Sequence, residues 1–342
     1  MGGETACIMT LQHGRHILAS GQLDCFDARG RPVDCAGSGQ DGEFRPGVAW
    51  PEPRFALLGH DLIQDLLTGL FWTRVAGLGD FPMSWAEALS AVAGMNRDKA
   101  LGHADWRLPN RRELASLVSP AHQRPALPSG HPFIVSQTWY WTSTTASLAP
   151  RYAWHVHLEG GRMFYGDKGR DAMVWPVRGV GAVLPRTGQR RCWDAGGVAV
   201  ACLGTGQDGE LRQGVPWPEP RFTREKGGVH DALTGLLWTL SADQAGPCSW
   251  EQALHAAQGC REGGRNWRLP TIRELESLVD ADEHSPALPR DHPFRDPREA
   301  YWSSTSSAFA PDWAYCLYLH KGAVGVGFKA KREFHAWFVA LE

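Results

Sequence analysis

The sequence predicts two copies of one α+β domain in tandem. The first observation is a repeat, because residues 25–55 (CFDARGRPVDCAGSGQDGEFRPGVAWPEPRF) match residues 192–222 (CWDAGGVAVACLGTGQDGELRQGVPWPEPRF) without a gap. The offset is 192 − 25 = 167 residues, which is far longer than a solenoid period and indicates autonomous domains. The second observation is the order within each copy, where two helix-start signals precede alternating apolar segments.

The repeat continues downstream with small shifts. Residues 67–72 correspond to 233–238, 84–85 to 249–250, 106–109 to 267–270, 131–133 to 292–294, and 140–144 to 301–305. A Gly/Val/Pro stretch at 179–187 joins the copies. We therefore expect one domain over residues 1–182, which includes a Cys-containing leading segment. A second domain is expected over 183–342, and this copy is the expected ligand-display domain.

Local signals place the elements of each copy. Short strands are predicted at 70–73 and 236–239. Ser84 and Ser249 are N-caps of a first helix, with Glu87 and Gln252 at the capping-box position. A second helix follows the Trp-Arg-Leu-Pro segment, where Asn110 and Thr271 are N-caps and Glu113 and Glu274 stand three residues on. The last third of each copy alternates apolar and polar residues, as strands do.

Composition excludes several classes of protein. Hydrophobic residues make up 43% of the chain and charged residues 21%, which suits a globular core rather than disorder. The formal net charge of -2 argues against a nucleic-acid partner, because phosphate binding needs a dense Lys/Arg footprint. No apolar run is long enough to span a membrane. Residues 1–8 lack the pattern of a signal peptide, so a cytoplasmic location stays open beside an extracellular or cell-surface one.

The cysteines favour an oxidising compartment. Cys25 with Cys35 and Cys192 with Cys202 recur at the same spacing in both copies. Cys248 and Cys260 form a third candidate pair, while Cys7 and Cys316 are left over. Six pairable cysteines indicate disulfides and a protein outside the cytoplasm, with incidental thiols in a reduced protein as the alternative. No Cys-x-x-Cys motif points to zinc.

Several motifs together resemble a known bacterial family. They are LTGLFW (67–72), SWAEAL (84–89), WRLPNRREL (106–114), YWTST (140–144), YAWHV (152–156) and VWPVRG (174–179), with near-matches in the second copy. The chain resembles the C-terminal domain of the Legionella collagen-like adhesin, which implies a C-type-lectin-like fold and ligand recognition, including adhesion to polysaccharides. Similar domains serve as variable proteins of diversity-generating retroelements, whose terminal strands carry a hypervariable binding face.

The same fold houses formylglycine-generating oxidases, whose Trp-Arg-Leu-Pro-like segment looks similar. Those enzymes need a pair of active-site cysteines late in the domain. The first copy has no late cysteine and the second has only Cys316, so this departure argues against an oxidase. No Ser-His-Asp triad or carboxylate pair repeats with a meaningful spacing either. We therefore expect no enzymatic activity.

Comparison of the late strands of the two copies predicts the binding face. Tyr152, Trp154, Val156 and Leu158 share one face, and the second copy keeps that face apolar. The opposite face is rewritten between copies, as an exchangeable surface would be, although neutral drift is the alternative. The predicted ligand-binding residues are Arg151, His155, His157, Glu159, Phe164, Asp167, Asp312, Ala314, Cys316, Tyr318, His320, Lys321, Gly325, Gly327, Phe328, Lys329 and Lys331.

Metal sites have weaker support. His155 and His157 could share a metal, but no third ligand is evident. The loops at 37–42 and 204–209 could bind Ca²⁺ through Asp41 and Asp208, with Asp27 and Asp194, although a structural turn explains them better. No cofactor is expected. The predicted function is non-enzymatic binding of a protein or glycan ligand, with a purely structural role for one copy left open.

Overall fold

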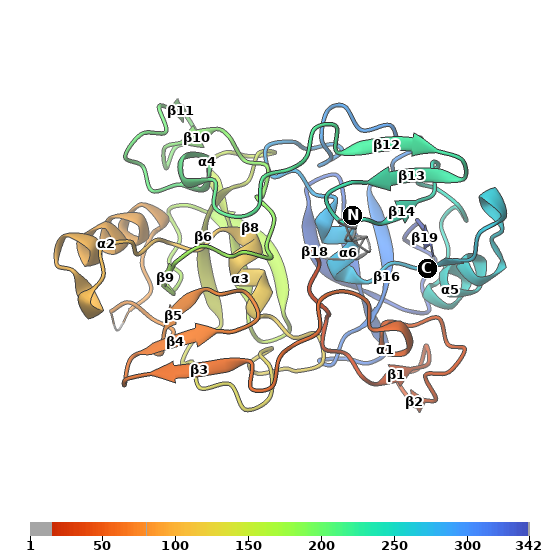
Figure 1. Ribbon diagram of the computed structural model, residues 1–342, viewed down its shortest axis with the longest axis horizontal. Helices are drawn as coiled ribbons and strands as arrows, with labels where there is room; N and C mark the ends of the chain where they lie inside the picture. The colour runs from red at the N-terminus through yellow and green to blue at the C-terminus, as the bar shows by residue number, and fades with distance from the viewer. Residues whose placement is uncertain (1–15, 80, 341–342) are drawn as a thin grey trace, which may run out of the picture.

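The computed structural model describes residues 16–79 and 81–340, and each copy builds the same series of elements (Figure 1). The first copy comprises β1 (Cys25–Phe26), β2 (Pro32–Val33), α1 (Asp41–Phe44), β3 (Phe55–Leu58), β4 (Leu62–Asp65), β5 (Phe71–Thr73), α2 (Trp85–Arg97), the 3-10 turn η1 (Ala100–Gly102), α3 (Arg111–Leu117), β6 (Trp139–Thr145), β7 (Tyr152–His157), β8 (Arg162–Asp167) and β9 (Val177–Arg178).

The second copy repeats this order with one extra short strand. It comprises β10 (Cys192–Trp193), β11 (Ala199–Val200), α4 (Asp208–Leu211), β12 (Phe222–Glu225), β13 (Gly228–Asp231), β14 (Leu237–Trp238), α5 (Trp250–Gly259), η2 (Glu262–Gly264), β15 (Trp267–Arg268), α6 (Ile272–Ser277), β16 (Ala300–Ser306), β17 (Trp313–Tyr318), β18 (Ala323–Phe328) and β19 (Val339–Ala340). Helices and antiparallel sheets thus make up both copies.

All four predicted helix starts are confirmed. The N-cap side chains of α2, α3, α5 and α6 accept a hydrogen bond from the backbone N–H three residues on, and the Glu or Gln at that position accepts one from the N-cap N–H. In α3 and α6 the cap Glu has a second role. Glu113 is ion-paired with Arg107, and Glu274 with Arg268, so the Trp-Arg-Leu-Pro segment is fastened to the helix that it precedes.

One six-stranded antiparallel sheet runs through both copies, in the order β16-β17-β18-β8-β7-β6. Strand β18 of the second copy pairs with β8 of the first, with Val324 opposite Met163. Smaller sheets, β3-β4-β5-β9 and β12-β13-β14-β19-β15, belong to one copy each. The two copies are therefore joined by a backbone ladder about a pseudo-two-fold axis at Met163 and Val324.

Helices α3 and α6 lie side by side at the centre of the molecule, and α2 and α5 lie at its two ends (Figure 1). A single large core extends through both copies and includes Leu114 of α3, Leu275 of α6 and apolar residues of the shared sheet. Ten of the sixteen tryptophans are almost fully buried, so the high tryptophan content mainly serves the cores.

The leading segments are exchanged between the copies. In Figure 1 the red hairpin β1–β2 and α1 lie against the blue second copy, and β10, β11 and α4 lie against the first copy. Asp41 of α1 accepts a hydrogen bond from Thr305 of β16 at 2.6 Å, and Asp208 of α4 accepts the equivalent bond from Thr144 of β6 at 2.7 Å. Each domain is thus completed by a segment that comes from the other repeat.

In the described part of the chain, no helix combines the length and apolar character needed to cross a lipid bilayer. The predicted boundary near residue 182 stays a prediction, since chain order and spatial grouping differ for the leading segments. The C-type-lectin-like assignment likewise stays a prediction.

Candidate functional site

An aromatic surface crosses the junction between the two copies on one face of the shared sheet. We call it the seam face, and it consists of Trp139, His155, His157, Arg162, Phe164 and Tyr318. Strand register places these side chains together, because Trp139 is opposite His157, His157 opposite Arg162, and His155 opposite Phe164.

A glycine lets the two copies meet on this face. Gly325 lies beside both rings, since a Cβ built on it would come within 2.6 Å of the Tyr318 ring and 3.2 Å of the Phe164 ring. A larger residue would displace both. Phe164 and Tyr318 come from different copies, so the seam face exists only in the tandem arrangement.

Trp139 is the most accessible part of the seam face. Its side chain is 40% exposed, and its ring centroid lies 4.5 Å from that of His155 and 4.1 Å from that of His157. Two imidazoles therefore hold the indole in place. At the other end, the Lys321 ammonium lies 5.0 Å from the centre of the Tyr318 ring, within cation–π range. The result is a rigid aromatic platform with a cation at its edge.

The two histidines of the platform are electrically neutral near pH 7. Burial lowers the pKa of His155 to about 4. Burial also lowers the pKa of His157, and the neighbouring Arg162 adds to this effect. His157 Nδ1 lies 3.3 Å from Arg162, and its Nε2 lies 3.7 Å from Glu159. Within the described residues, no group of three or more potential metal ligands surrounds them.

A family model described as the Lcl C-terminal domain matches residues 61–178 and again residues 227–340. The chain belongs to the Lcl C-terminal domain family. The two matches together span more than half of the chain, and the repeat deduced from the sequence corresponds to them. No curated protein matches the sequence.

Both Lcl C-terminal domains keep the predicted apolar strand face inside the core. Trp154, Val156 and Leu158 of the first domain are buried there, as are Leu317 and Leu319 of the second. The opposite face is only partly open, because α2 and α5 cover its outer ends. Helix α5 shares a core with Ala314 and Cys316, so these two predicted ligand-binding residues are covered by that helix.

The predicted binding residues accordingly fall into three groups. His155, His157, Phe164 and Tyr318 form the seam face, with His320 and Lys321 at its edge. Arg151, Asp167, Asp312, Phe328 and Lys331 lie at the far end of the strands, where Arg151 is ion-paired with Asp167. Glu159 lies at the edge of the seam face beside His157 and pairs with Arg124 at 3.0 Å. The buried group consists of Ala314, Cys316, Gly325, Gly327 and Lys329, and these residues are covered by neighbouring side chains in this fold.

Lys329 illustrates why burial overrides the prediction for that group. Its ammonium donates to the carbonyls of Phe26 and Asp27 in the leading segment of the other repeat and to the Ser306 hydroxyl, and it lies 3.9 Å from the centre of the Trp250 ring. Burial lowers its pKa to about 7. Lys168 of the first Lcl C-terminal domain likewise donates to the carbonyls of Trp193 and Asp194 and lies over the Trp85 ring, so this lysine fastens the exchanged segments.

The candidate calcium carboxylates serve the same exchange. Asp41 and Asp208 are buried and hydrogen-bonded to threonine hydroxyls, while Asp27 caps the turn of its own hairpin by accepting from the backbone of Arg29 and Arg31. These contacts make the loops structural turns.

Two of the three candidate cysteine pairs form. Cys25 is bonded to Cys35, and Cys192 to Cys202. Cys248 and Cys260 are free thiols, which corrects the third pair: Cys248 is buried in the core beneath α5, and Cys260 is the C-cap of that helix. Cys316 is also free and buried, and Cys7 lies outside the described residues.

The sequence reasoning missed Trp139 and Arg162. Trp139 precedes the buried Tyr140-Trp141 pair, and in the second copy Ala300 stands at its position, so the difference between copies was the available signal. Arg162 stands opposite His157 in the strand pairing, a neighbour that only the register reveals.

Proposed function

We propose that this protein is a non-enzymatic binding protein that recognises an acidic or sulfated glycan through the seam face. The observation that carries the proposal is the platform of Trp139, Phe164 and Tyr318 on paired strands, with Arg162 and Lys321 beside it. Aromatic rings offer apolar area to the C–H faces of sugars at little entropic cost, and the cations suit acidic substituents. A protein ligand is the other outcome that the test must recognise.

Family membership and cysteine chemistry support an extracellular adhesive role. The resemblance to the collagen-like adhesin implies a C-type-lectin-like fold and polysaccharide adhesion. Two disulfides with the same ten-residue separation suit an oxidising environment outside the cytoplasm. A location at the cell surface or in the medium therefore belongs to the proposal.

The two alternative functions have less support. A thiol oxidase needs an accessible thiolate, whereas burial raises the pKa of Cys316 to about 12. A retroelement variable protein would display the rewritten positions, but Ala314, Gly325 and Lys329 are buried. A near-copy of the segment encoding residues 301–337 in the neighbouring DNA, differing only at adenines, would restore that second alternative.

The proposal is tested by binding the full chain to an array of neutral, uronic-acid and sulfated glycans at two salt concentrations. We expect signals from acidic glycans that weaken with salt, since exposed charges are screened. Trp139→Ala and Tyr318→Ala should each weaken binding by about tenfold or more, as central aromatic contacts do. Phe81→Ala removes an aromatic that is 77% exposed and lies outside the seam face, so it should bind normally.

A flat array would contradict the glycan proposal. Equal binding by wild type and both seam variants would contradict the site. Binding to a protein and to no glycan, with the same loss in the Trp139 and Tyr318 variants, would keep the surface and replace the ligand class.

A further inference from the structure

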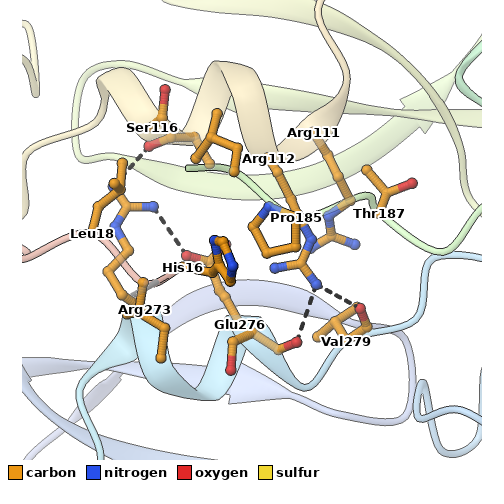
Figure 2. Close-up of a pocket in the computed structure, with 14 residues that line it drawn as sticks. His16, Leu18, Arg111, Arg112, Ser116, Pro185, Thr187, Arg273, Glu276 and Val279 are labelled. Carbon is orange, nitrogen blue, oxygen red and sulfur yellow. Dashed lines mark hydrogen bonds and ion pairs between the residues drawn. The ribbon is translucent and has the colours of Figure 1, made fainter. Parts of the chain in front are cut away.

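A cavity of about 50 Å³ lies on the pseudo-two-fold axis, between α3 and α6 and away from the seam face (Figure 2). Arg111 and Arg112 reach it from α3, and Arg273 and Glu276 reach it from α6. Apolar residues of both leading segments, among them Leu18 and Pro185, close the wall. We call it the axial cavity.

Two of the three arginines are accounted for by the architecture. Arg112 donates to the carbonyls of Ser277 at 3.2 Å and Val279 at 2.9 Å, at the C-terminal end of α6. Arg273 donates to the carbonyls of Ala115 and Val118, at the C-terminal end of α3. Each helix end is thus capped by a cation from the other copy, as helix dipoles favour.

Arg111 breaks this symmetry. The second copy has Ile272 at the equivalent place after the N-cap, so the fold does not require a guanidinium there. Arg111 is 4% exposed, and its guanidinium carbon lies 4.1 Å from the centre of the Trp154 ring. Its Nη2 donates to the Gly322 carbonyl, while its Nη1 makes no hydrogen bond within the described residues. A buried donor without a partner is costly.

The axial cavity also has an excess of positive charge. Three guanidiniums line it against one carboxylate, Glu276, which lies 3.1 Å from Arg273. Burial lowers the pKa of Arg112 to about 9, and the neighbouring arginines Arg221 and Arg111 add to the effect. Burial lowers the pKa of Arg111 to about 10. Both therefore remain charged near pH 7; Glu276, with Asp208 for Arg111 and Asp280 for Arg112, offsets part of their repulsion, and an anion in the cavity would add to this.

The volume limits what can enter. One water needs roughly 10–15 Å³ of such space, so the axial cavity accommodates a few waters or one small polyatomic ion. A guanidinium with a free N–H matches planar or tetrahedral oxygen groups. The apolar wall leaves room for nothing larger than a short organic acid.

We propose that the axial cavity binds one small oxyanion, with Arg111 Nη1 as a donor to it, and that the ion stabilises the junction between the two copies. Carboxylate, phosphate and sulfate share the required chemistry. This site is independent of the seam face, so the oxyanion proposal is tested separately from the glycan proposal.

The test uses the full chain, titrated by isothermal calorimetry with acetate, inorganic phosphate and sulfate at constant ionic strength, with chloride as the reference. Thermal unfolding is followed in the same buffers. We expect one site per chain for at least one of these ions and a rise in Tm of a few degrees at saturating ion, since a ligand of the native state stabilises it. Which ions bind identifies the class of oxyanion.

Arg111→Ile copies the residue of the second copy and should abolish both the calorimetric site and the ion-specific rise in Tm. Arg29→Ala removes one positive charge from an exposed position and should keep both. An equal rise in Tm in Arg111→Ile would overturn the proposal, because sulfate and phosphate also stabilise proteins by exclusion from the surface. Arg111→Lys keeps the charge in case the Ile variant fails to fold. It should bind about tenfold more weakly, and unchanged affinity would likewise overturn the site.

Discussion

At the scale of single residues, one buried aspartate in each leading segment holds that segment on the other copy. Asp41 and Asp208 are buried at equivalent places, and each accepts from a threonine of the other copy's sheet. Burial raises the pKa of both carboxyls to about 6, above the ordinary value of 3.8. Folding thus favours the neutral acid over the ionised carboxylate at both positions.

This preference predicts that the stabilising contribution of the two carboxyls falls as the pH rises. A carboxyl with a raised pKa in the native state contributes stability that is complete below pH 3.8 and is lost as the pH rises through about 6. Between pH 4.5 and 7.5 the contribution of each carboxyl to the free energy of unfolding should fall by roughly 2 kcal/mol, while the buried His155, whose pKa is lowered, acts in the opposite direction. In urea denaturation the stability of the double variant Asp41→Asn/Asp208→Asn relative to the wild type should rise by roughly 4 kcal/mol between pH 4.5 and 7.5, because only the wild type loses the contribution of the two carboxyls.

Asp24→Asn, at an exposed position of the same leading segment, is the matched control for this comparison. It should follow the wild-type profile. Parallel profiles for the double variant and the wild type would show that the two buried carboxyls remain ionised throughout.

At the scale of elements, the hairpins β1–β2 and β10–β11 are too short to be stable as isolated elements. Each has two residues per strand, and a disulfide closes each of them. An isolated two-stranded hairpin is marginal in water, so covalent closure supplies part of its order. The hairpin then presents Phe26 and Asp27, or Trp193 and Asp194, to the lysine of the other copy.

Loss of one hairpin disulfide should therefore destabilise the protein measurably. For a loop of this length the chain-entropy relation gives about 2–3 kcal/mol, so Cys25→Ser/Cys35→Ser should lower the free energy of unfolding by that amount. Cys260→Ser removes a free thiol and should leave it unchanged. In thiol titration of the denatured wild type, reduction should expose four additional thiols, and a gain of none would contradict both disulfides.

At the scale of the whole molecule, the two copies are arranged like the subunits of a homodimer, but they are linked in one polypeptide. The β8–β18 ladder, the reciprocal helix caps from Arg112 and Arg273, and the exchanged leading segments all repeat about one axis. The contacts that hold the leading segment are equivalent in both copies, since Thr144 and Lys168 correspond to Thr305 and Lys329. Either leading segment should therefore fit either copy.

This equivalence predicts that residues 183–342 expressed alone form a homodimer. Each leading segment would dock on the partner's sheet through Asp208, as Asp41 does in the intact chain. Size-exclusion chromatography with light scattering should give twice the monomer mass, because a monomer would leave the β18 edge and the α6 face uncovered. Val324→Lys, which puts a charge at the axis, should abolish the dimer, whereas a stable folded monomer of the unmodified segment would contradict the prediction.

The sequence by itself determined the features that depend on residues close in the chain. Capping boxes at Ser84, Asn110, Ser249 and Thr271 span three residues, and the two disulfides span ten, so spacing alone predicts them. The repeat revealed two domains, and alternation revealed which strand face enters the central core, because side-chain direction has a fixed period of two.

Only the tertiary structure decided which copy completes which. The bonds of Lys329 to Phe26 and of Thr305 to Asp41 join residues more than 260 positions apart, and each has an equivalent in the other copy, so no local pattern distinguishes exchange from self-docking. The same holds for the burial of Cys316 under α5 and for the meeting of Phe164 with Tyr318 over Gly325. A sequence records which side chains can pack, but the partner of each face is chosen by the free energy of the whole assembly.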